Sequence, residues 1–476
     1  MTELAEPTTL EAALRLIAEL HALVEQQAQR IAEQDKRIAE LEEKQRKDSS
    51  NSSKPPFSDG FTKKKYPPKK PSGRKRGGQP GHKKHERTLL PVEKARSVTE
   101  VKPPSCERCG KKLRGEDPCP RRHQIVDLPV IEPLLDEYRL HTLECEDKAC
   151  GHRTEARLPE GVSSIGFGPG VDAMVGQVAG MMRTGKRTTA DTMLDLFGVP
   201  MSVGAVMDAQ TRLSKAVEVP CDKVLVYAQK QDIENADETG WPEGTRGVFL
   251  WVCVTTMVVA FLIQAKRSAS AAGVLLGVAT GILGTDRYSG YGWWPTAMRQ
   301  VCWAHLIRDF RAIAERGESS GVLGKALLVE SERMFAWWTR VRDGGLPQTT
   351  FQVYMKMVRH RVEALLLRGM TDPNLKTART RKNMWKIREA FWTFVRVEGV
   401  EPTNNAAEQA LRFAVLWRKM CYGTKSVTGS QFVARVLTVY GTLRKQNKNV
   451  HPFLRAACEA HRSGQAPPSL LPDSAA

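Results

Sequence analysis

Residues 236–265 read ADETGWPEGTRGVFLWVCVTTMVVAFLIQA and contain the pattern that decides the fold. From Gly247 to Ala265 the chain carries no charged side chain for 19 residues, close to the length of a membrane-spanning helix. The stretch is rich in Val, Thr and aromatic residues, however, and Thr255-Thr256-Met257 interrupts its centre. This composition favours two buried β-strands joined by a tight turn over a membrane helix.

Acidic residues recur at three points around these strands. Asp237 begins the stretch, Asp286 follows a small-residue helix expected near 269–279, and Glu408 opens a late helix. An RNase H-like sheet collects three carboxylates at one edge in this order. We therefore predict an α/β RNase H-like catalytic core with these three acids. Because polar residues precede Asp237, Asp232 remains an alternative first acid.

Three carboxylates suit one kind of chemistry. Cutting and joining DNA is an in-line displacement at a phosphodiester, in which two Mg²⁺ or Mn²⁺ ions stabilise the attacking and leaving oxygens. Such hard ions take oxygen ligands. Each acid also has an ordinary structural explanation: a turn before Gly240, an ion pair with Arg287, or an exposed pair with Arg412 worth about 0.3–0.5 kcal/mol.

The charge of the chain points to a nucleic-acid partner. Lys and Arg outnumber Asp and Glu by 72 to 53, so the net charge is +19. An anionic membrane, or no such partner at all, is the alternative. Between Lys54 and Lys84, eleven cations face a single acid, Asp59, among Ser, Pro and Gly. We expect this arm to be disordered and to bind DNA phosphates without sequence preference, the alternative being a solubilising linker. The predicted DNA contacts are Lys63, Lys64, Lys65, Lys69, Lys70, Arg74, Lys75 and Arg76.

The N-terminal segment has the heptad pattern of a coiled coil. Apolar residues recur every seventh position at Leu10, Ile17, Val24, Ile31 and Ile38. Nearly five heptads without Pro or Gly favour self-association over a single helix folded against its own chain.

Two close cysteine pairs indicate a structural Zn²⁺ ion. The predicted ligands are Cys106 and Cys109 together with Cys145 and Cys150, while Cys119, His123 and His152 are possible substitutes. Four such ligands suit tetrahedral zinc, and the alternative is free thiols in a reducing compartment.

A helical region is expected from Gly161 to about Glu218. Within it, a helix over Thr189–Leu196, a turn at Gly198 and a second helix capped by Ser202 resemble a DNA-binding helix-turn-helix. An ordinary helical hairpin explains the same signals.

Several sequence motifs appear in a fixed order. They are Ala236-Asp237-Glu238-Thr239-Gly240, Thr285-Asp286-x-Tyr288-x-x-Tyr291, Cys302-Trp303-Ala304-His305-Leu306-x-Arg308-x-Phe310, Asn404-Asn405-x-x-Glu408-x-x-Leu411-Arg412 and Arg418-Lys419. In these motifs, the chain resembles transposases of the insertion-sequence 66 family. The coiled coil, the cysteine module and the arm with Gly78-Gln79-Pro80-Gly81-His82 extend the resemblance over nearly the whole chain.

The resemblance implies a DDE active site made of Asp237, Asp286 and Glu408, which are also the Mg²⁺ ligands. It implies a supporting role for Cys302 and His305, the latter orienting the site or contacting DNA. Further supporting residues are Arg412, Arg418 and Lys419. The long step between the second and third acids implies an inserted, mainly helical region.

These observations predict a multidomain chain. The expected parts are a coiled coil at 1–47, a basic arm at 48–100, a zinc-ribbon-like module at 101–160, a helical region at 161–220, a core at 221–312 and 398–462 interrupted by a helical insertion at 313–397, and a disordered tail at 463–476.

The predicted function is DNA transposition: the chain binds element ends and catalyses strand cleavage and transfer on double-stranded DNA. A non-catalytic DNA-binding regulator and a nuclease that cuts without joining are the alternatives. We expect a homo-oligomer, with accessory proteins of the same element as possible partners. No secretory signal follows Met1, so a bacterial, cytoplasmic, nucleoid-associated protein is expected.

Overall fold

The charge-free stretch forms two neighbouring strands, as its composition predicts. Strand β4 (Arg246–Val254) pairs antiparallel with β5 (Val259–Gln264). Between them, the Thr255 backbone N–H donates to the Val258 carbonyl oxygen at 3.0 Å and closes a tight turn. In the part of the chain that the structure describes, no helix has both the length and the apolar character needed to cross a bilayer.

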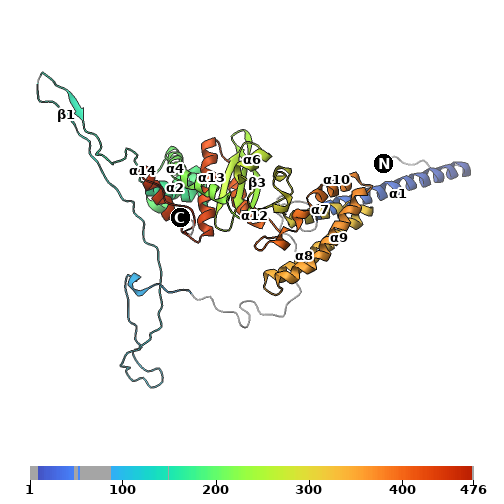
Figure 1. Cartoon of the computed structure of the whole chain (residues 1–476), viewed down its shortest axis with the longest axis horizontal. Helices are drawn as coiled ribbons and strands as arrows, with labels where there is room; N and C mark the ends of the chain where they lie inside the picture. The colour runs from blue at the N-terminus through green and yellow to red at the C-terminus, as the bar shows by residue number, and fades with distance from the viewer. Residues whose placement is uncertain (1–8, 48–51, 54–86, 148, 474–476) are drawn as a thin grey trace. The chain divides into compact units, whose positions relative to one another are not determined.

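The computed structural model describes residues 9–47, 52–53, 87–147 and 149–473 (Figure 1). The chain divides into two units, one composed of Met1–Gly60 with Pro133–Ala476 and the other of Phe61–Glu132. Every cation predicted to contact DNA in the basic arm lies outside the described residues.

A five-stranded mixed sheet is the centre of the larger unit. Its order is β5-β4-β3-β6-β7, where β3 is Ile233–Glu243, β6 is Ile282–Thr285 and β7 is Arg299–Val301. Strand β3 pairs antiparallel with β4 and parallel with β6, which pairs parallel with β7. Of the polar residues before Asp237, a poor strand by sequence, Glu234 and Asn235 thus lie within the central strand. Both pair with β6, and Asn235 also pairs with β4, so tertiary context overrides propensity.

Helices cover the sheet and protect its edge. Helix α13 (Val427–Lys445) packs on β5, and α12 (Asn405–Cys421) packs on β3 and β4 (Figure 1). The backbone N–H groups of Val259 and Phe261 on the edge strand donate to the hydroxyls of Thr442 and Thr438 at 3.0 and 2.9 Å. These bonds occupy backbone donors that an open edge would offer to another chain.

The remaining elements of the larger unit have the following bounds. Near the sheet lie α5 (Glu218–Ala228), α6 (Ala269–Leu276), α7 (Trp303–Ala314), η3 (Ser289–Tyr291) and η4 (Thr296–Met298). The helical region contains α2 (Pro169–Met181), α3 (Lys186–Phe197), α4 (Val203–Ala216) and, from the C-terminal part, α14 (Val450–Ser463). The insertion contains α8 (Glu318–Arg342), α9 (Gln348–Arg368), η5 (Gly369–Thr371), α10 (Leu375–Lys386), η6 (Arg388–Phe391) and α11 (Thr393–Arg396).

The turn between α3 and α4 has the predicted local chemistry. Gly198 adopts the left-handed conformation with φ of 63°, which glycine tolerates without strain. Ser202 Oγ accepts a hydrogen bond from the Ala205 backbone N–H at 3.1 Å and caps α4. The two helices and their turn therefore form where expected, whereas DNA recognition by them stays a prediction.

One buried carboxylate connects three helices of this region. Asp172 of α2 is only 1% exposed and forms ion pairs of 2.6 Å with Arg212 of α4 and 2.5 Å with Arg462 of α14. A buried acid needs such partners, since removing one would leave an uncompensated charge in the interior. The C-terminal helix is thereby fixed to helices from before the sheet.

Part of the segment 463–476, expected to be disordered, packs against the core, although its first residues are exposed. Leu470 is 1% exposed and joins the hydrophobic core around the sheet. Its carbonyl oxygen accepts a hydrogen bond from Gln446 Nε2 at 3.1 Å. Burial of the apolar Leu470 side chain explains why this part of the segment is ordered. The polar, proline-rich composition of the segment does not predict this contact.

The N-terminal helix α1 (Leu10–Arg46) covers the predicted coiled-coil segment. Its heptad residues are exposed in the single chain, with exposed fractions of 61% for Ile17 and 65% for Val24. Self-association through this stripe stays a prediction.

Both cysteine pairs lie on tight turns. Gly110 N–H donates to the carbonyl oxygen of Cys106 at 2.8 Å, and Cys145 lies at the end of the hairpin of β1 (Thr142–Glu144) and β2 (Arg153–Glu155). A short 3-10 helix, η2 (Val92–Lys94), precedes them. The pairs belong to different units, and the four-cysteine zinc site stays a prediction.

The buried carboxyl of Glu234 in β3 predicts a dependence of stability on pH. The side chain is fully buried, and burial raises its pKa to about 7 from 4.5, while a hydrogen bond from Cys253 lowers it. Below pH 4.5 the carboxyl keeps its proton whether the chain is folded or not. As pH rises toward 7, only the unfolded chain ionises, so stability falls; above pH 7 the loss is complete.

We expect Glu234→Gln to remove this loss. The variant should exceed the wild type in free energy of unfolding by up to about 3 kcal/mol at pH 8 and by much less near pH 5. Denaturant unfolding at both pH values measures the difference. Glu401→Gln, at an exposed acid, is the matched control, and equal effects of both variants would contradict the prediction.

Candidate active site

The parallel pairing of β3 with β6 brings the first two acids together. Ile233 lies opposite Ile282, and Asn235 lies opposite Gly284. The same register, continued for two residues, sets Asp237 opposite Asp286, the first residue after β6. The charge of Asp286 raises the pKa of Asp237, which indicates that the two carboxylates lie near each other.

Asn404 fixes the start of the helix that carries the third acid. Its buried side chain donates from Nδ2 to the Ala236 carbonyl oxygen at 2.8 Å, directly beside Asp237. Helix α12 begins at the next residue and presents Glu408 in its first turn. A hydrogen bond across 168 positions of sequence thus aligns α12 with the central strand.

The pKa of Asp237 reflects the proximity of the other acids. Burial, and then the negative charges of Glu238, Asp286 and Glu408, together raise it to about 8, although the Glu238 backbone N–H lowers it. Carboxylates crowded in this way disfavour their own ionised forms unless a cation is near. The arrangement is chemically suited to divalent-ion binding through oxygen.

A second set of residues surrounds the acids. Arg267 forms an ion pair of 2.6 Å with Glu238, lies 4.0 Å from Asp286 Oδ2, and stacks 3.9 Å from the centroid of the Tyr288 ring. The Tyr291 hydroxyl donates to the other oxygen of Glu238. Glu238 and both tyrosines belong to the ordered sequence motifs, but no role was predicted for them from the sequence. Arg267 was not predicted from the sequence, because it lies in none of these motifs.

Cys302 and His305 lie beside Glu408. The Cys302 thiol is 3.9 Å from Glu408 Oε1, and His305 Nδ1 is 3.6 Å from the same oxygen. Burial raises the pKa of the thiol to about 11, although the Asn404 backbone N–H, which donates to the sulfur at 3.2 Å, lowers it. Cys302 is the N-cap residue of α7, His305 lies in the first turn of α7, and Glu408 lies in the first turn of α12.

Of the other predicted supporting residues, one contacts the sheet and two are exposed. Arg418 reaches β3, where it donates to Thr239 Oγ1 at 3.1 Å and to the Gly240 carbonyl oxygen. Arg412 and Lys419 are exposed on the same helix.

The structural alternatives for two acids do not match the structure. Arg287 donates to Asp309 at 2.7 Å and not to Asp286. Asp237 lies within β3 and does not start a turn. Asp232 is exposed and precedes the first residue of β3, and it is not among the carboxylates whose charges affect Asp237.

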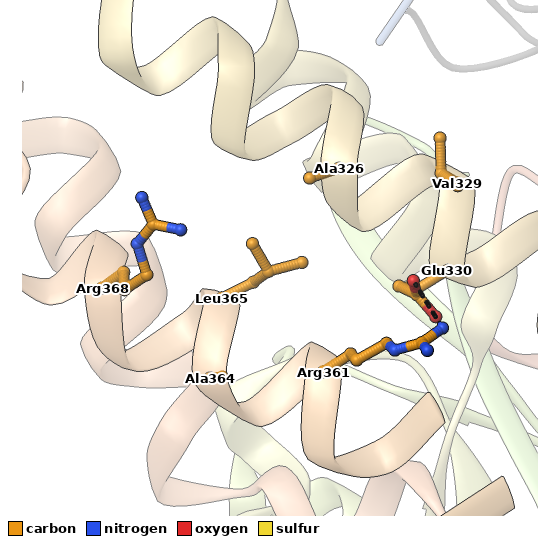
Figure 2. A pocket seen from close by; sticks show the side chains of 7 residues that line it. All are labelled: Ala326, Val329, Glu330, Arg361, Ala364, Leu365 and Arg368. Carbon is orange, nitrogen blue, oxygen red and sulfur yellow. Dashed lines mark ion pairs between the residues drawn. The ribbon is translucent and has the colours of Figure 1, made fainter. Parts of the chain in front are cut away.

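A hollow of about 510 Å³ lies between α8 and α9 of the insertion (Figure 2). Its wall includes Leu365 and the ion pair of Glu330 with Arg361, whose atoms are 3.7 Å apart. None of the predicted site residues lines it.

The fold and the site are those of an α/β protein that gathers acidic side chains beside the central strand of its sheet. The chain belongs to the Transposase IS66 family, whose model matches residues 187–432, more than half of the 476 residues. Residues 5–88 match a family of unknown function, DUF6444. No curated protein matches the chain. Family membership supports a transposase function.

The role of Asn404 yields a prediction about stability. Asn404→Ala should lower the free energy of unfolding by about 1–3 kcal/mol, because the Ala236 carbonyl oxygen loses its donor in the interior. Denaturant unfolding measures the change. The matched control is Asn405→Ala, since Asn405 is the exposed neighbour. A loss of the same size in both variants would show that the buried hydrogen bond from Asn404 to Ala236 does not contribute to the free energy of unfolding.

Proposed function

We propose that this chain is a DDE transposase that cuts and joins DNA at Asp237, Asp286 and Glu408. The observation that carries the proposal is the convergence of three carboxylates from β3, β6 and α12, each within an ordered motif of the family. The strand order, with three antiparallel strands followed by two parallel ones, supports an RNase H-like core.

The three acids fit the divalent ions that such an activity requires. They offer oxygen donors, and the raised pKa of Asp237 reflects a repulsion that a bound cation relieves. Two Mg²⁺ or Mn²⁺ ions, when bound, stabilise the charge on the attacking and leaving oxygens of a phosphodiester.

The residues around the acids hold them in position. Arg267 binds Glu238 and faces Asp286, so it limits how far either carboxylate moves. Arg418 holds α12 to β3 next to the acids. Two hydrogen-bonding anchors, Asn404 and Arg418, thus set the position of Glu408 relative to the sheet.

We further propose that the other modules bind DNA and join chains. The net charge of +19 favours phosphate contact, the basic arm supplies affinity, and the α3–α4 pair reads element ends. One Zn²⁺ ion held by Cys106, Cys109, Cys145 and Cys150 stabilises the intervening module. Helix α1 forms a coiled coil with other copies of the chain.

Conservative substitution of the acids tests the catalytic proposal. Asp237→Asn, Asp286→Asn and Glu408→Gln should each reduce Mg²⁺-dependent cleavage of donor ends below detection, because each removes a charged metal ligand. Binding of the same DNA, measured by fluorescence anisotropy, should remain nearly unchanged. Cleavage at the wild-type rate by one variant would exclude that residue as a ligand. A wild-type protein that binds the ends but never cuts them would favour the regulator.

Charge in the heptad stripe tests self-association. Val24→Lys with Ile31→Lys should lower the mass measured by sedimentation, because two charges would enter the helix seam. Gln26→Lys with Glu33→Lys places the same residue type on the outer face of the helix and should leave the mass unchanged. If the seam variant keeps the wild-type mass, the stripe does not join chains.

A further inference from the structure

Three chemically different ligands meet at one side of the candidate active site. The potential metal-binding atoms of Cys302, His305 and Glu408 all lie within 4.8 Å of one another. The cysteine and the histidine come from the start of α7, which follows β7 directly, and the glutamate comes from α12. The cluster therefore rests on the same framework as the acids but uses a different donor set.

The donor set favours a different metal from the one that three carboxylates favour. A thiolate sulfur and an imidazole nitrogen are ligands for Zn²⁺ and similar borderline ions, whereas Mg²⁺ takes oxygen. In tetrahedral zinc sites the ligand atoms lie about 3.5 Å apart, given bond lengths of about 2.0–2.3 Å. The separations of 3.9 Å from sulfur to carboxylate and 3.6 Å from nitrogen to carboxylate are within a few tenths of an ångström of this spacing.

The surroundings of the ligand atoms independently point to a ligand. His305 Nδ1 is buried and has no hydrogen-bond partner among the described residues. The Cys302 sulfur accepts a hydrogen bond from the Asn404 backbone N–H at 3.2 Å. An outer partner of this kind orients a metal ligand.

We propose that Cys302, His305 and Glu408 form a binding site for Zn²⁺ or another thiophilic divalent ion, with water as the fourth ligand. Coordination forms a metal–sulfur bond and releases the thiol proton to water. Because Glu408 is also one of the three proposed catalytic acids, the occupied site withdraws this carboxylate from the Mg²⁺ ligands. This last consequence rests on the proposed function, whereas binding itself does not.

Cobalt binding to the full-length chain tests the site without any assay of activity. Co²⁺ replaces Zn²⁺ in such sites, and its bond to thiolate absorbs in the near ultraviolet. The wild-type spectrum minus that of Cys302→Ser should show a thiolate-to-cobalt band that saturates at one Co²⁺ per chain. Cobalt bound at the other cysteine pairs contributes equally to both spectra and cancels.

Two further variants and a control make the result specific. Glu408→Gln and His305→Gln should each weaken the Co²⁺ affinity of this band at least tenfold, and they keep the test decisive if Cys302→Ser does not fold. Cys421→Ser, at a half-buried cysteine outside the cluster, should retain the full band. A folded Cys302→Ser protein with the wild-type spectrum would overturn the site, as would unchanged affinity in both other variants.

A second titration tests the shared role of Glu408. Zn²⁺ should inhibit Mg²⁺-dependent cleavage over the concentrations at which it displaces Co²⁺ from this site. Full cleavage with the site occupied by Zn²⁺ would overturn the sharing of Glu408. Loss of cleavage in the acid variants tests the proposed function separately, so the two failures are distinguishable.

Discussion

Repulsion between Asp237, Asp286 and Glu408 is the constraint that the surrounding structure has to overcome. Their mutual effect is visible in the pKa of Asp237, which burial and the neighbouring charges raise to about 8. Separate elements hold the acids in place: two parallel strands and a helix joined to the central strand by Asn404.

The third acid is held near the other two although a long insertion separates it from the second acid in sequence. The Trp303 backbone N–H donates to the Pro402 carbonyl oxygen at 2.9 Å, and the Asn404 backbone N–H donates to the Cys302 sulfur at 3.2 Å. The chain therefore leaves and re-enters the core at one place. The insertion has its own hydrophobic core, which Val301 and Trp303 join to the sheet. Its size consequently has little effect on the position of Glu408.

Two different groups of side chains lie beside the acids. On one side, Arg267 supplies a cation to Glu238 and Asp286. On the other, Cys302 and His305 supply soft donors beside Glu408. In the two proposals, Glu408 is a ligand both in an oxygen set and in a sulfur–nitrogen set, which would couple the proposed chemistry to the kind of metal that is present.

Sequence alone determined the features that depend on local chemistry. The charge-free stretch predicted two strands, Gly198 and Ser202 predicted a turn and a cap, and ordered motifs identified the family. Those motifs also predicted the three acids, which the structure gathers and whose catalytic role stays a proposal. Only the tertiary structure decided that Glu234 and Asn235 lie in the central strand, that Leu470 belongs to the core, and that Arg267 lies beside the acids. These outcomes depend on contacts between residues far apart in sequence, whose energies no local pattern records. The cluster of Cys302, His305 and Glu408 has the same origin, because the glutamate is 106 positions away from the cysteine in sequence.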